Sequence, residues 1–171
     1  MKLNLVETKV KSDVEIIIVQ KETNLKDKKI LKKLNFEGAD ESCVLLLEQQ
    51  KIYVGCDNTS DGLRVAAAVG IRKLNETTFK TASIIANENL REIIEGLELG
   101  NYTFNKYKSK KKVQKEKTIN IIVEHISQKE IDVFQETVNV SNSVNMVRDF
   151  VNTAPDDFYP KIMANEAIKI A

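Results

Sequence analysis

The sequence predicts an α/β fold in which helices flank a mixed sheet of strands. Two observations favour this class. Short runs of β-branched and aliphatic residues, which are typical of buried strands, alternate along the chain with longer segments whose apolar residues recur at helical spacing. The composition is that of a folded domain, because 42% of the 171 residues are hydrophobic and 30% are charged.

Five runs have the length and composition of strands. They are Val14–Gln20, Ser42–Leu47, Lys51–Cys56, Thr81–Ala86 and Thr118–His125. Only three residues, Glu48–Gln50, separate the second run from the third, so these two are expected to form a hairpin. Helical segments separate the other runs, which favours a mostly parallel sheet.

The first two helices are expected between these strands. A short, lysine-rich helix is predicted over Leu25–Leu34. The segment from Leu63 to Leu74 carries a single apolar stripe, as a helix packed on a sheet does. Either Ser60 or Asp61 is expected to be its N-cap, because both can accept a hydrogen bond from the first turn.

Two further helices follow the later strands. Leu90–Leu97 carries a second apolar stripe, which Gly100 is expected to end. From Lys129 a long helix is predicted to run toward Val151. Its inward residues are expected to include Ile131, Phe134, Val138, Val144, Val147 and Val151.

A joint that contains both prolines of the chain follows the long helix. Pro155 should break that helix, and Pro160 is tolerated in the first turn of another, predicted within Phe158–Ala171. We expect three parts: a domain at 1–128, a linker helix at 129–154 and the truncated start of a second domain at 155–171. No later residue of this chain could cover the apolar face of the last helix, which is formed by Ile162, Met163, Ala167 and Ile170.

The charge balance argues against a general attraction to nucleic acid or to an anionic membrane. Lysine and arginine number 26 against 25 aspartates and glutamates, so the formal net charge is only +1. The first residues lack the apolar core of a secretory signal, and the longest apolar runs are too short to span a bilayer. We therefore expect a cytoplasmic protein without a membrane partner. Cys43 and Cys56 are expected to be buried, reduced thiols.

The segment Asp57–Gly62, with the sequence DNTSDG, is the part of the chain most similar to a calcium loop. An EF-hand loop needs Asp or Asn at its third position and Glu at its twelfth, and these positions hold Thr59 and Ala68. A turn that leads into a helix explains the same residues. The sequence therefore predicts no metal ligand here.

Catalytic and nucleotide-binding residues are not predicted either. His125 is the only histidine, so a site that needs two is excluded, and no Ser–His–acid or Cys–His pair is supported. The carboxylates are spread along the chain. None of the six glycines lies in a phosphate-binding pattern, which counts against a dinucleotide or ADP-ribose cofactor.

The most basic segment, Lys106–Lys117, leaves one alternative open. Three aromatic residues, Tyr102, Phe104 and Tyr107, lie in or just before it. Basic residues beside aromatic ones can follow a nucleic-acid backbone and stack on its bases, so a stand-alone nucleic-acid-binding module is the second hypothesis. A solvated surface loop explains the same composition.

Two stretches resemble a known family. NLREIIEGLELGNYTFNKYKSKKK (Asn89–Lys112) resembles the "EGL-LG-Y-F--YKS" signature of the leucine aminopeptidases, also called cytosol aminopeptidases, and MVRDFVNTAPDDFYPKIMANEA (Met146–Ala167) resembles their "R-L-N-P-N-L-P" segment. Leu63–Gly70 is similar to an upstream stretch of that family. Phe150 stands where leucine is commoner, and Ala154 and Asp156 replace a proline and an asparagine.

The resemblance implies an N-terminal α/β domain similar to macro domains, followed by a long helix and a catalytic domain with two divalent metals, manganese or zinc. The family's metal-binding motifs lie after the NTAP joint, so this chain is expected to hold no catalytic, cofactor or metal residue and to be inactive alone. The parent would be a hexameric, metal-dependent hydrolase that releases N-terminal amino acids, and peptides would bind only through its catalytic domain. Some bacterial relatives bind DNA, so DNA is a further partner to test.

Overall fold

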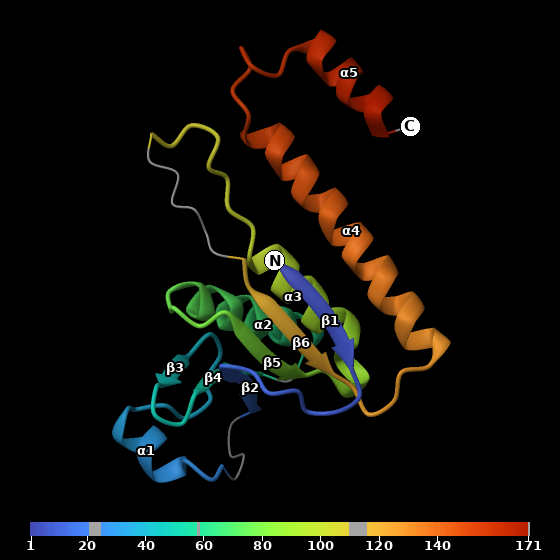
Figure 1. Cartoon of the computed structure of the whole chain (residues 1–171). Helices are drawn as coiled ribbons and strands as arrows, with labels where there is room; N and C mark the ends of the chain where they lie inside the picture. Colours follow the sequence, from blue (N-terminus) through green and yellow to red (C-terminus); the bar gives the residue numbers. More distant parts are fainter. Residues whose placement is uncertain (21–24, 58, 110–115, 171) are drawn as a thin grey trace.

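The computed structural model describes residues 1–20, 25–57, 59–109 and 116–170. These residues form a six-stranded sheet with the strand order β1-β6-β5-β2-β4-β3 (Figure 1). All neighbouring strands are parallel except β3, which pairs antiparallel with β4 as the predicted hairpin. The strands are β1 (Lys2–Val6), β2 (Val14–Gln20), β3 (Cys43–Leu46), β4 (Lys51–Cys56), β5 (Thr81–Ile85) and β6 (Thr118–Ile122).

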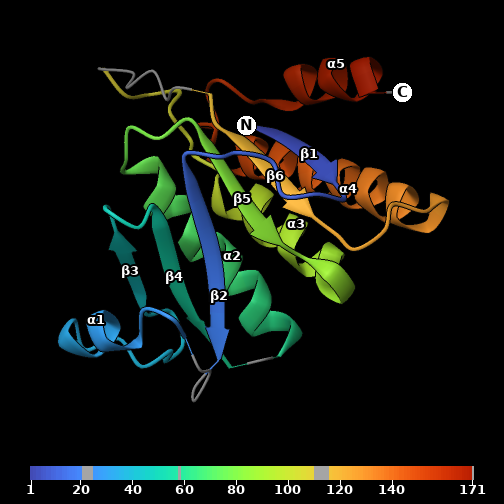
Figure 2. The same ribbon diagram turned by 60° about the horizontal axis from the view of Figure 1, so that its bottom comes forward.

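Helices lie on both faces of this sheet, which confirms the predicted α/β class (Figures 1 and 2). The helices are α1 (Lys28–Lys33), α2 (Ser60–Asn75), α3 (Leu90–Gly100), α4 (Gln128–Asn152) and α5 (Pro160–Ile170), with a short 3₁₀ turn, η1 (Asn87–Asn89), before α3. In the described part of the chain, α2 and α3 cover one face and α1 covers the other. α4 packs along α3.

The alternation of side chains along each strand produces one core on each face. In β4, Ile52 and Val54 enter the larger core under α2 and α3, whereas Tyr53 enters the smaller core under α1. In β2, Ile16 enters the larger core and Val19 enters the smaller one. This pattern is the period of two that a strand covered on both faces requires.

Small residues set the close approach of α2 and α3. A Cβ atom on Gly96 would lie 2.6 Å from Cβ of Ala67, and one on Gly100 would lie 2.5 Å from Cα of Ala68. Both glycines lie in the EGLELG stretch that resembles the family signature. That stretch therefore has a packing role, because its glycines let the two helices touch.

The small helix α1 is held to the sheet by a half-buried carboxylate. Asp27, directly before α1, accepts hydrogen bonds from Nζ of Lys51 at 2.7 Å and from the hydroxyl of Tyr53 at 2.6 Å. Both bonds lower the pKa of Asp27 below its ordinary value of 3.8, and the bond from Lys51 has the largest effect. The tyrosine ring is buried beneath α1 in the smaller core.

β2 and β5 are joined at their starts by a reciprocal clamp. The carboxylate of Asp13 accepts from the backbone N–H groups of Lys80 at 2.8 Å and Thr81 at 2.9 Å, and the backbone N–H of Asp13 donates to Oγ1 of Thr81. Hydrogen bonds from the backbone of Thr81, and then of Lys80, lower the pKa of Asp13 below its ordinary value of 3.8. The clamp fixes the register of the two central strands.

The edge strand β1 was not predicted from the sequence. Its sequence, KLNLV, is interrupted by polar residues and forms no continuous apolar run, and it pairs with β6 in parallel at Lys2–Thr118 through Val6–Ile122. The hydrogen bond from the side chain of Asn4 to that of Asn120 at 3.0 Å spans 116 positions. This segment is a strand because it pairs with β6, which its own sequence does not indicate.

The inward face of α4 differs from the prediction in its second half. Phe134 and Val138 pack on the core as expected. Val144, Val147 and Val151 were wrongly predicted to point inward, since 38%, 52% and 79% of their surface is exposed. Beyond Val138 polar side chains make the contact with the end of α3: Ser141 is buried, and Asn145 and Arg148 donate to the carbonyls of Glu98 and Leu99.

The last helix, α5, begins at Pro160 as predicted and has no buried residue. Met163 and Ile170, predicted to share its apolar face, are 60% and 58% exposed. Among the described residues, no helix combines the length and the apolarity that a bilayer-spanning segment needs. The division into 1–128, 129–154 and 155–171 stays a prediction.

Candidate functional site

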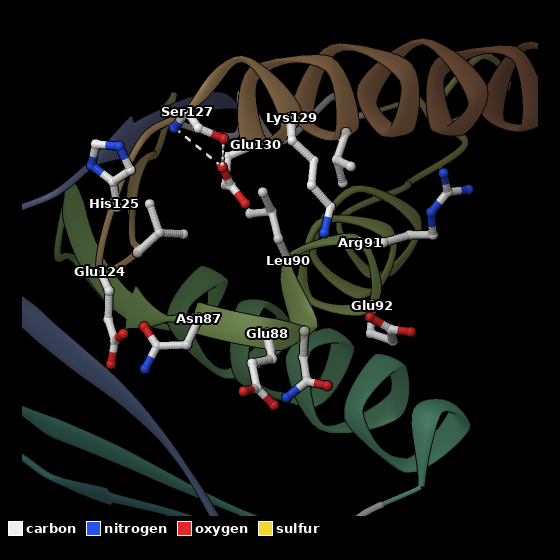
Figure 3. A pocket seen from close by; sticks show the side chains of 13 residues that line it. Asn87, Glu88, Leu90, Arg91, Glu92, Glu124, His125, Ser127, Lys129 and Glu130 are labelled. Atoms are coloured by element: carbon white, nitrogen blue, oxygen red, sulfur yellow. Dashed lines mark hydrogen bonds between the residues drawn. The ribbon is translucent and has the colours of Figure 1, made fainter.

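A large cleft lies at the carboxyl edge of the sheet, where β5 and β6 end and where α3 and α4 begin (Figure 3). Its volume is about 870 Å³, within the range of small-molecule sites. Glu124 and His125 reach it from the end of β6, and Asn87 and Glu88 reach it from η1. Parallel strands bring these loops together because all their carboxyl ends lie on one edge.

The start of α4 is closed by its own side chains. Ser127 is the N-cap, and its backbone N–H donates to Oε2 of Glu130 at 3.1 Å while its hydroxyl donates to the same carboxylate. The hydrogen bond from the hydroxyl is the main cause of a lowered pKa at Glu130. A carboxylate therefore already occupies the end of the helix dipole that would otherwise attract an anion.

The single histidine is an exposed surface residue. Nδ1 of His125 lies 3.0 Å from Oε1 of Glu7, and 79% of its side chain is exposed. The same carboxylate accepts from the backbone N–H of Ile126 at 2.7 Å. Ser127 lies near this pair, but its hydroxyl donates a hydrogen bond to Glu130. These residues therefore do not form a nucleophilic triad.

The cleft carries more acidic than basic side chains. Four carboxylates line it, against one lysine, one arginine and His125. Arg91 forms an ion pair with Glu136 on α4 at 3.2 Å. Figure 3 shows Asn87, Glu88 and Glu124 on the side of the cleft opposite the start of α4. The cleft therefore suits a cationic ligand better than a phosphate.

Sequence reasoning missed this cleft. Its residues come from two stretches, 87–92 and 123–133, which are far apart in the sequence. One signal could have located it: polar residues directly follow two consecutive parallel strands, as Asn87 does after β5 and Glu124 after β6. The carboxyl edge of a parallel sheet is where such residues converge.

The segment Asp57–Gly62 is a helix-capping turn. Thr59, one residue before the predicted Ser60 or Asp61, is the N-cap of α2 and accepts from the backbone N–H of Gly62 at 2.9 Å. Asp57 in turn accepts from the backbone N–H and the hydroxyl of Thr59. Asp61 pairs with Arg64 at 3.0 Å. Residue 58 lies outside the described residues.

The described residues do not fit a metal centre. Asp57 and Asp61 are directed to different partners, and no group of three or more His, Cys, Asp or Glu side chains in the described ranges could hold an ion. We therefore derive no chemical step through a metal in this chain. The expectation that the chain itself binds none stays a prediction.

The two cysteines lie in the neighbouring strands β3 and β4. Cys56 is buried at the end of β4, whereas Cys43 is only half-buried. The prediction that both thiols are buried is therefore confirmed only for Cys56. Desolvation raises the pKa of the Cys43 thiol above its ordinary value of 9.0.

The basic segment Lys106–Lys117 is described only at its ends, because residues 110–115 lie outside the described ranges. Lys117, which was expected in a solvated loop, is instead 6% exposed and donates to the backbone carbonyls of Thr77 (3.0 Å) and Phe79. Lys106 pairs with Asp157 at 3.5 Å. Lys117 thus faces the protein, whereas Lys106 and Lys108 are exposed, and the nucleic-acid hypothesis gains no support from these described lysines.

The two stretches that resemble the family signatures meet in space. The hydroxyl of Tyr107 accepts from the backbone N–H of Ala154 at 2.7 Å and donates to Asp157 at 2.8 Å. The hydroxyl of Tyr102 donates to Asp149 at 2.9 Å and accepts from Asn152 at 3.1 Å.

Two ring contacts complete this joint, which comprises residues 102–107 and 148–158. The guanidinium of Arg148 lies 5.5 Å from the ring centre of Tyr102. The rings of Phe150 and Phe158 stack at 4.7 Å, so the phenylalanine at position 150 has its own partner across the break in the helix.

Comparisons with known proteins agree with this architecture. The model of the cytosol aminopeptidase family, N-terminal domain, matches residues 4–111. A Clostridium perfringens protein named "Probable cytosol aminopeptidase" is 35% identical over 97 residues, covering 54% of this chain and 20% of that protein. A protein of the same name from Wolinella succinogenes is 26% identical over 178 residues, covering 95% of this chain and 37% of that protein.

A solved structure shares the fold along the whole chain. A mutant of tomato leucine aminopeptidase superposes with a TM-score of 0.83 at 16% identity, covering 100% of this chain and 42% of that chain. The present chain spans only 20% and 37% of the two curated relatives. Because the family model covers more than half of the chain, the chain belongs to the cytosol aminopeptidase family and contains its N-terminal domain.

Proposed function

We propose that this chain is the non-catalytic N-terminal part of a metal-dependent leucyl aminopeptidase, which releases N-terminal amino acids from peptides. The observation that carries the proposal is the match to an N-terminal domain model together with the small share, 20% and 37%, of the curated relatives that the chain spans. A catalytic domain would follow the joint in the parent protein.

Catalysis would belong to the part of the parent beyond this chain. There, two divalent metals, manganese or zinc, would activate a water and polarise the scissile carbonyl. The described residues of this chain offer no such ligand set. In this proposal the parent is a cytoplasmic homo-hexamer, and the chain contributes to folding and assembly.

The joint suits this role. Tyr102 and Tyr107 tie the loop after α3 to the end of α4 and to the residues before α5. They fix the direction in which the backbone continues beyond Ala154. Such a clamp would orient a following domain relative to this one, since a helix end without tertiary contacts frays.

The parent reading frame tests the proposal. We expect the gene to continue beyond Ala171 into a segment rich in lysine and acidic metal ligands, and the full product to release leucine from a leucyl amide only with manganese or zinc. A reading frame that stops near Ala171, or a full product that is inactive with either ion, would contradict the proposal.

A further inference from the structure

β1 is the end strand of the sheet, and only β6 pairs with it in the described ranges. Figure 1 shows it at one margin of the sheet, in front of α3. The backbone N–H of Lys2 and the backbone C=O of Val6 bond to residues that flank β6, at 2.8 Å and 3.0 Å. Backbone groups of successive residues point to opposite sides of a strand. Those of Leu3 and Leu5 therefore point to the outer edge, where no described strand meets them.

The outer edge of β1 lacks the usual protection. Proteins protect such edges with proline, a bulge or a charge within the strand, or cover them with another element. KLNLV contains no proline, and its pairing with β6 continues without a bulge from Lys2 to Val6. Its only charged residue, Lys2, is at the start. Leu3 and Leu5 pack against the larger core but are only half-buried, so part of their aliphatic surface is uncovered.

The sequence of β1 is self-complementary in an antiparallel arrangement. Two copies related by a two-fold axis present the same surface to each other, and paired edges then run in opposite directions. An axis at Asn4 places Leu3 of each copy opposite Leu5 of the other. Because the backbone groups of both leucines face outward, each of these pairs can exchange two hydrogen bonds. The leucine side chains then extend the larger cores of the two copies toward each other.

Charge also favours this arrangement. Lys2 at the start of β1 is exposed, and Glu7, directly after its end, has 45% of its side chain exposed. Around an axis at Asn4, the basic start of one strand lies beside the acidic end of the other. Opposite charges on adjacent strands stabilise the pairing, whereas like charges oppose it. Asn4 is uncharged, so no like charges meet at the axis itself.

The other edge strand, β3, is similar in its backbone but not in its charges. Cys43 and Leu45 face outward, because the residues between and beside them bond to β4. Exposed acidic residues lie at both ends: Asp40 and Glu41 precede the strand, and Glu48 follows it. Antiparallel pairing of two β3 edges would bring these acids together, so β3 is disfavoured as a self-pairing edge.

We propose that two copies of this chain associate through the outer edges of β1, antiparallel about a two-fold axis at Asn4, and join their six-stranded sheets into one. Only one short strand of each copy makes the contact, so it belongs with the small, reversible interfaces. Half-association is therefore expected between about 10 µM and about 1 mM. The surface uses this chain's own residues and does not depend on the proposed aminopeptidase activity.

Sedimentation of the whole chain tests the association, and amide exchange tests the surface. We expect the mass to rise from 19.4 kDa in dilute solution toward twice that value at about 1 mM. Over this range the amides of Leu3 and Leu5 should become at least about tenfold slower to exchange, whereas those of Asn4 and Val6, which already face β6, should change little. A monomer at every concentration, or a dimer in which Leu3 and Leu5 exchange as in the monomer, would overturn the proposal.

A proline at the outer edge tests the backbone pairing. Leu5→Pro removes an N–H that points away from β6, so the bonds between β1 and β6 are kept. Association should weaken at least about tenfold. Leu45→Pro is the matched control on β3 and should associate like the original chain. Unchanged association of a folded Leu5 variant, or an equal loss in both folded proline variants, would contradict the β1 edge.

A charge variant tests the same surface even if a proline variant does not fold. Lys2→Glu brings glutamates of the two copies together at each end of the contact, and the exposed position should tolerate the change. Association should weaken at least about threefold at low salt and recover partly at high salt. Lys29→Glu, an exposed position on α1, makes the same charge change and should have no effect. Equal association of the two charge variants would refute the proposed pairing.

A cysteine at the axis tests the register. Directly opposed residues that exchange no hydrogen bonds have Cα atoms about 4.5 Å apart, which suits a disulfide. Asn4→Cys should therefore oxidise to a covalent dimer at least about tenfold faster than Lys2→Cys, whose two cysteines would be several residues apart. Equal rates would contradict the axis at Asn4. A chain that stays monomeric leaves the reading-frame test of the proposed function unaffected, because that test uses no residue of β1.

Discussion

The hydroxyl of Tyr107 donates a 2.8 Å hydrogen bond to Oδ2 of Asp157, 50 residues further along the chain. It also accepts from the backbone N–H of Ala154 at 2.7 Å. One phenol thus connects the loop after α3 with the turn between α4 and α5. The two stretches that resemble the aminopeptidase signatures are therefore parts of one joint.

Replacing Tyr107 with phenylalanine should loosen the joint without unfolding the domain. The change removes two hydrogen bonds, each of which contributes about 1 kcal/mol, from a residue that is half exposed. We expect amide exchange of residues 154–158 to accelerate at least about fivefold, with an unchanged melting temperature. Tyr159→Phe, which also removes an exposed hydroxyl, should leave that exchange unchanged. Equal exchange in the Tyr107 variant would show that the phenol does not hold the joint.

Replacing Gly96 with alanine should destabilise the whole domain. The added Cβ would lie 2.3 Å from the backbone oxygen of Arg64 and 2.6 Å from Cβ of Ala67, so α2 and α3 would have to separate. Overpacking of this kind costs about 1–3 kcal/mol. Urea unfolding should show a lower midpoint with an unchanged slope, whereas Asn142→Ala on the exposed face of α4 should change the midpoint little. A midpoint equal to that of the original chain would contradict the close helix approach.

Removing the Asp13 carboxylate should destabilise the chain in a pH-dependent way. Asp13→Ala leaves the N–H groups of Lys80 and Thr81 without their acceptor, at a cost of about 1–3 kcal/mol at neutral pH. The pKa of Asp13 is lowered in the folded state, so its contribution is complete above the ordinary value of 3.8 and is lost as the pH falls through the lowered one.

Urea titrations at several pH values check the direction of this pH dependence. The difference in unfolding free energy between the original chain and Asp13→Ala should be largest near pH 7 and should shrink below pH 3.8. Asp40→Ala, at an exposed loop position, should show a small difference at every pH. If the difference in unfolding free energy between the original chain and Asp13→Ala grew on acidification, the clamp would be refuted.

The amides of α5 should exchange fast in a dilute solution of this chain. None of its residues is buried, and a helix of eleven residues is marginal in water without tertiary contacts. Exchange of α3, which is buried between α2 and α4, should be slow by comparison. Strong protection of α5 in a monomer would mean that the boundary predicted at residue 155 is wrong.

The helices and the longer strands were predictable because their signals are local. β4 and α3 have the predicted starts, and both were recognised from an apolar run or stripe within their own sequence. β1 was not recognisable, since only its pairing with β6 makes it a strand. Val144 and Val147 were misassigned because a helical stripe does not reveal where the neighbouring helix ends.

The sites could be predicted only in part. The capping turn at Asp57–Gly62 follows from a local pattern and was recognised. The joint was not, because Tyr107 meets Asp157 only through the fold. The family resemblance identified the two stretches that form the joint, without indicating that they touch.

The most direct test of the central claim is the aminopeptidase activity of this chain alone. A two-metal hydrolase needs ligands that hold both ions within about 4 Å of each other, and the described residues provide no such group. We predict that the purified chain releases no leucine from a chromogenic leucyl amide, and that neither manganese nor zinc raises its melting temperature. Metal-dependent turnover that follows the chain through a further purification step, at a rate near that of a full-length relative, would contradict the assignment of this chain as a non-catalytic N-terminal domain.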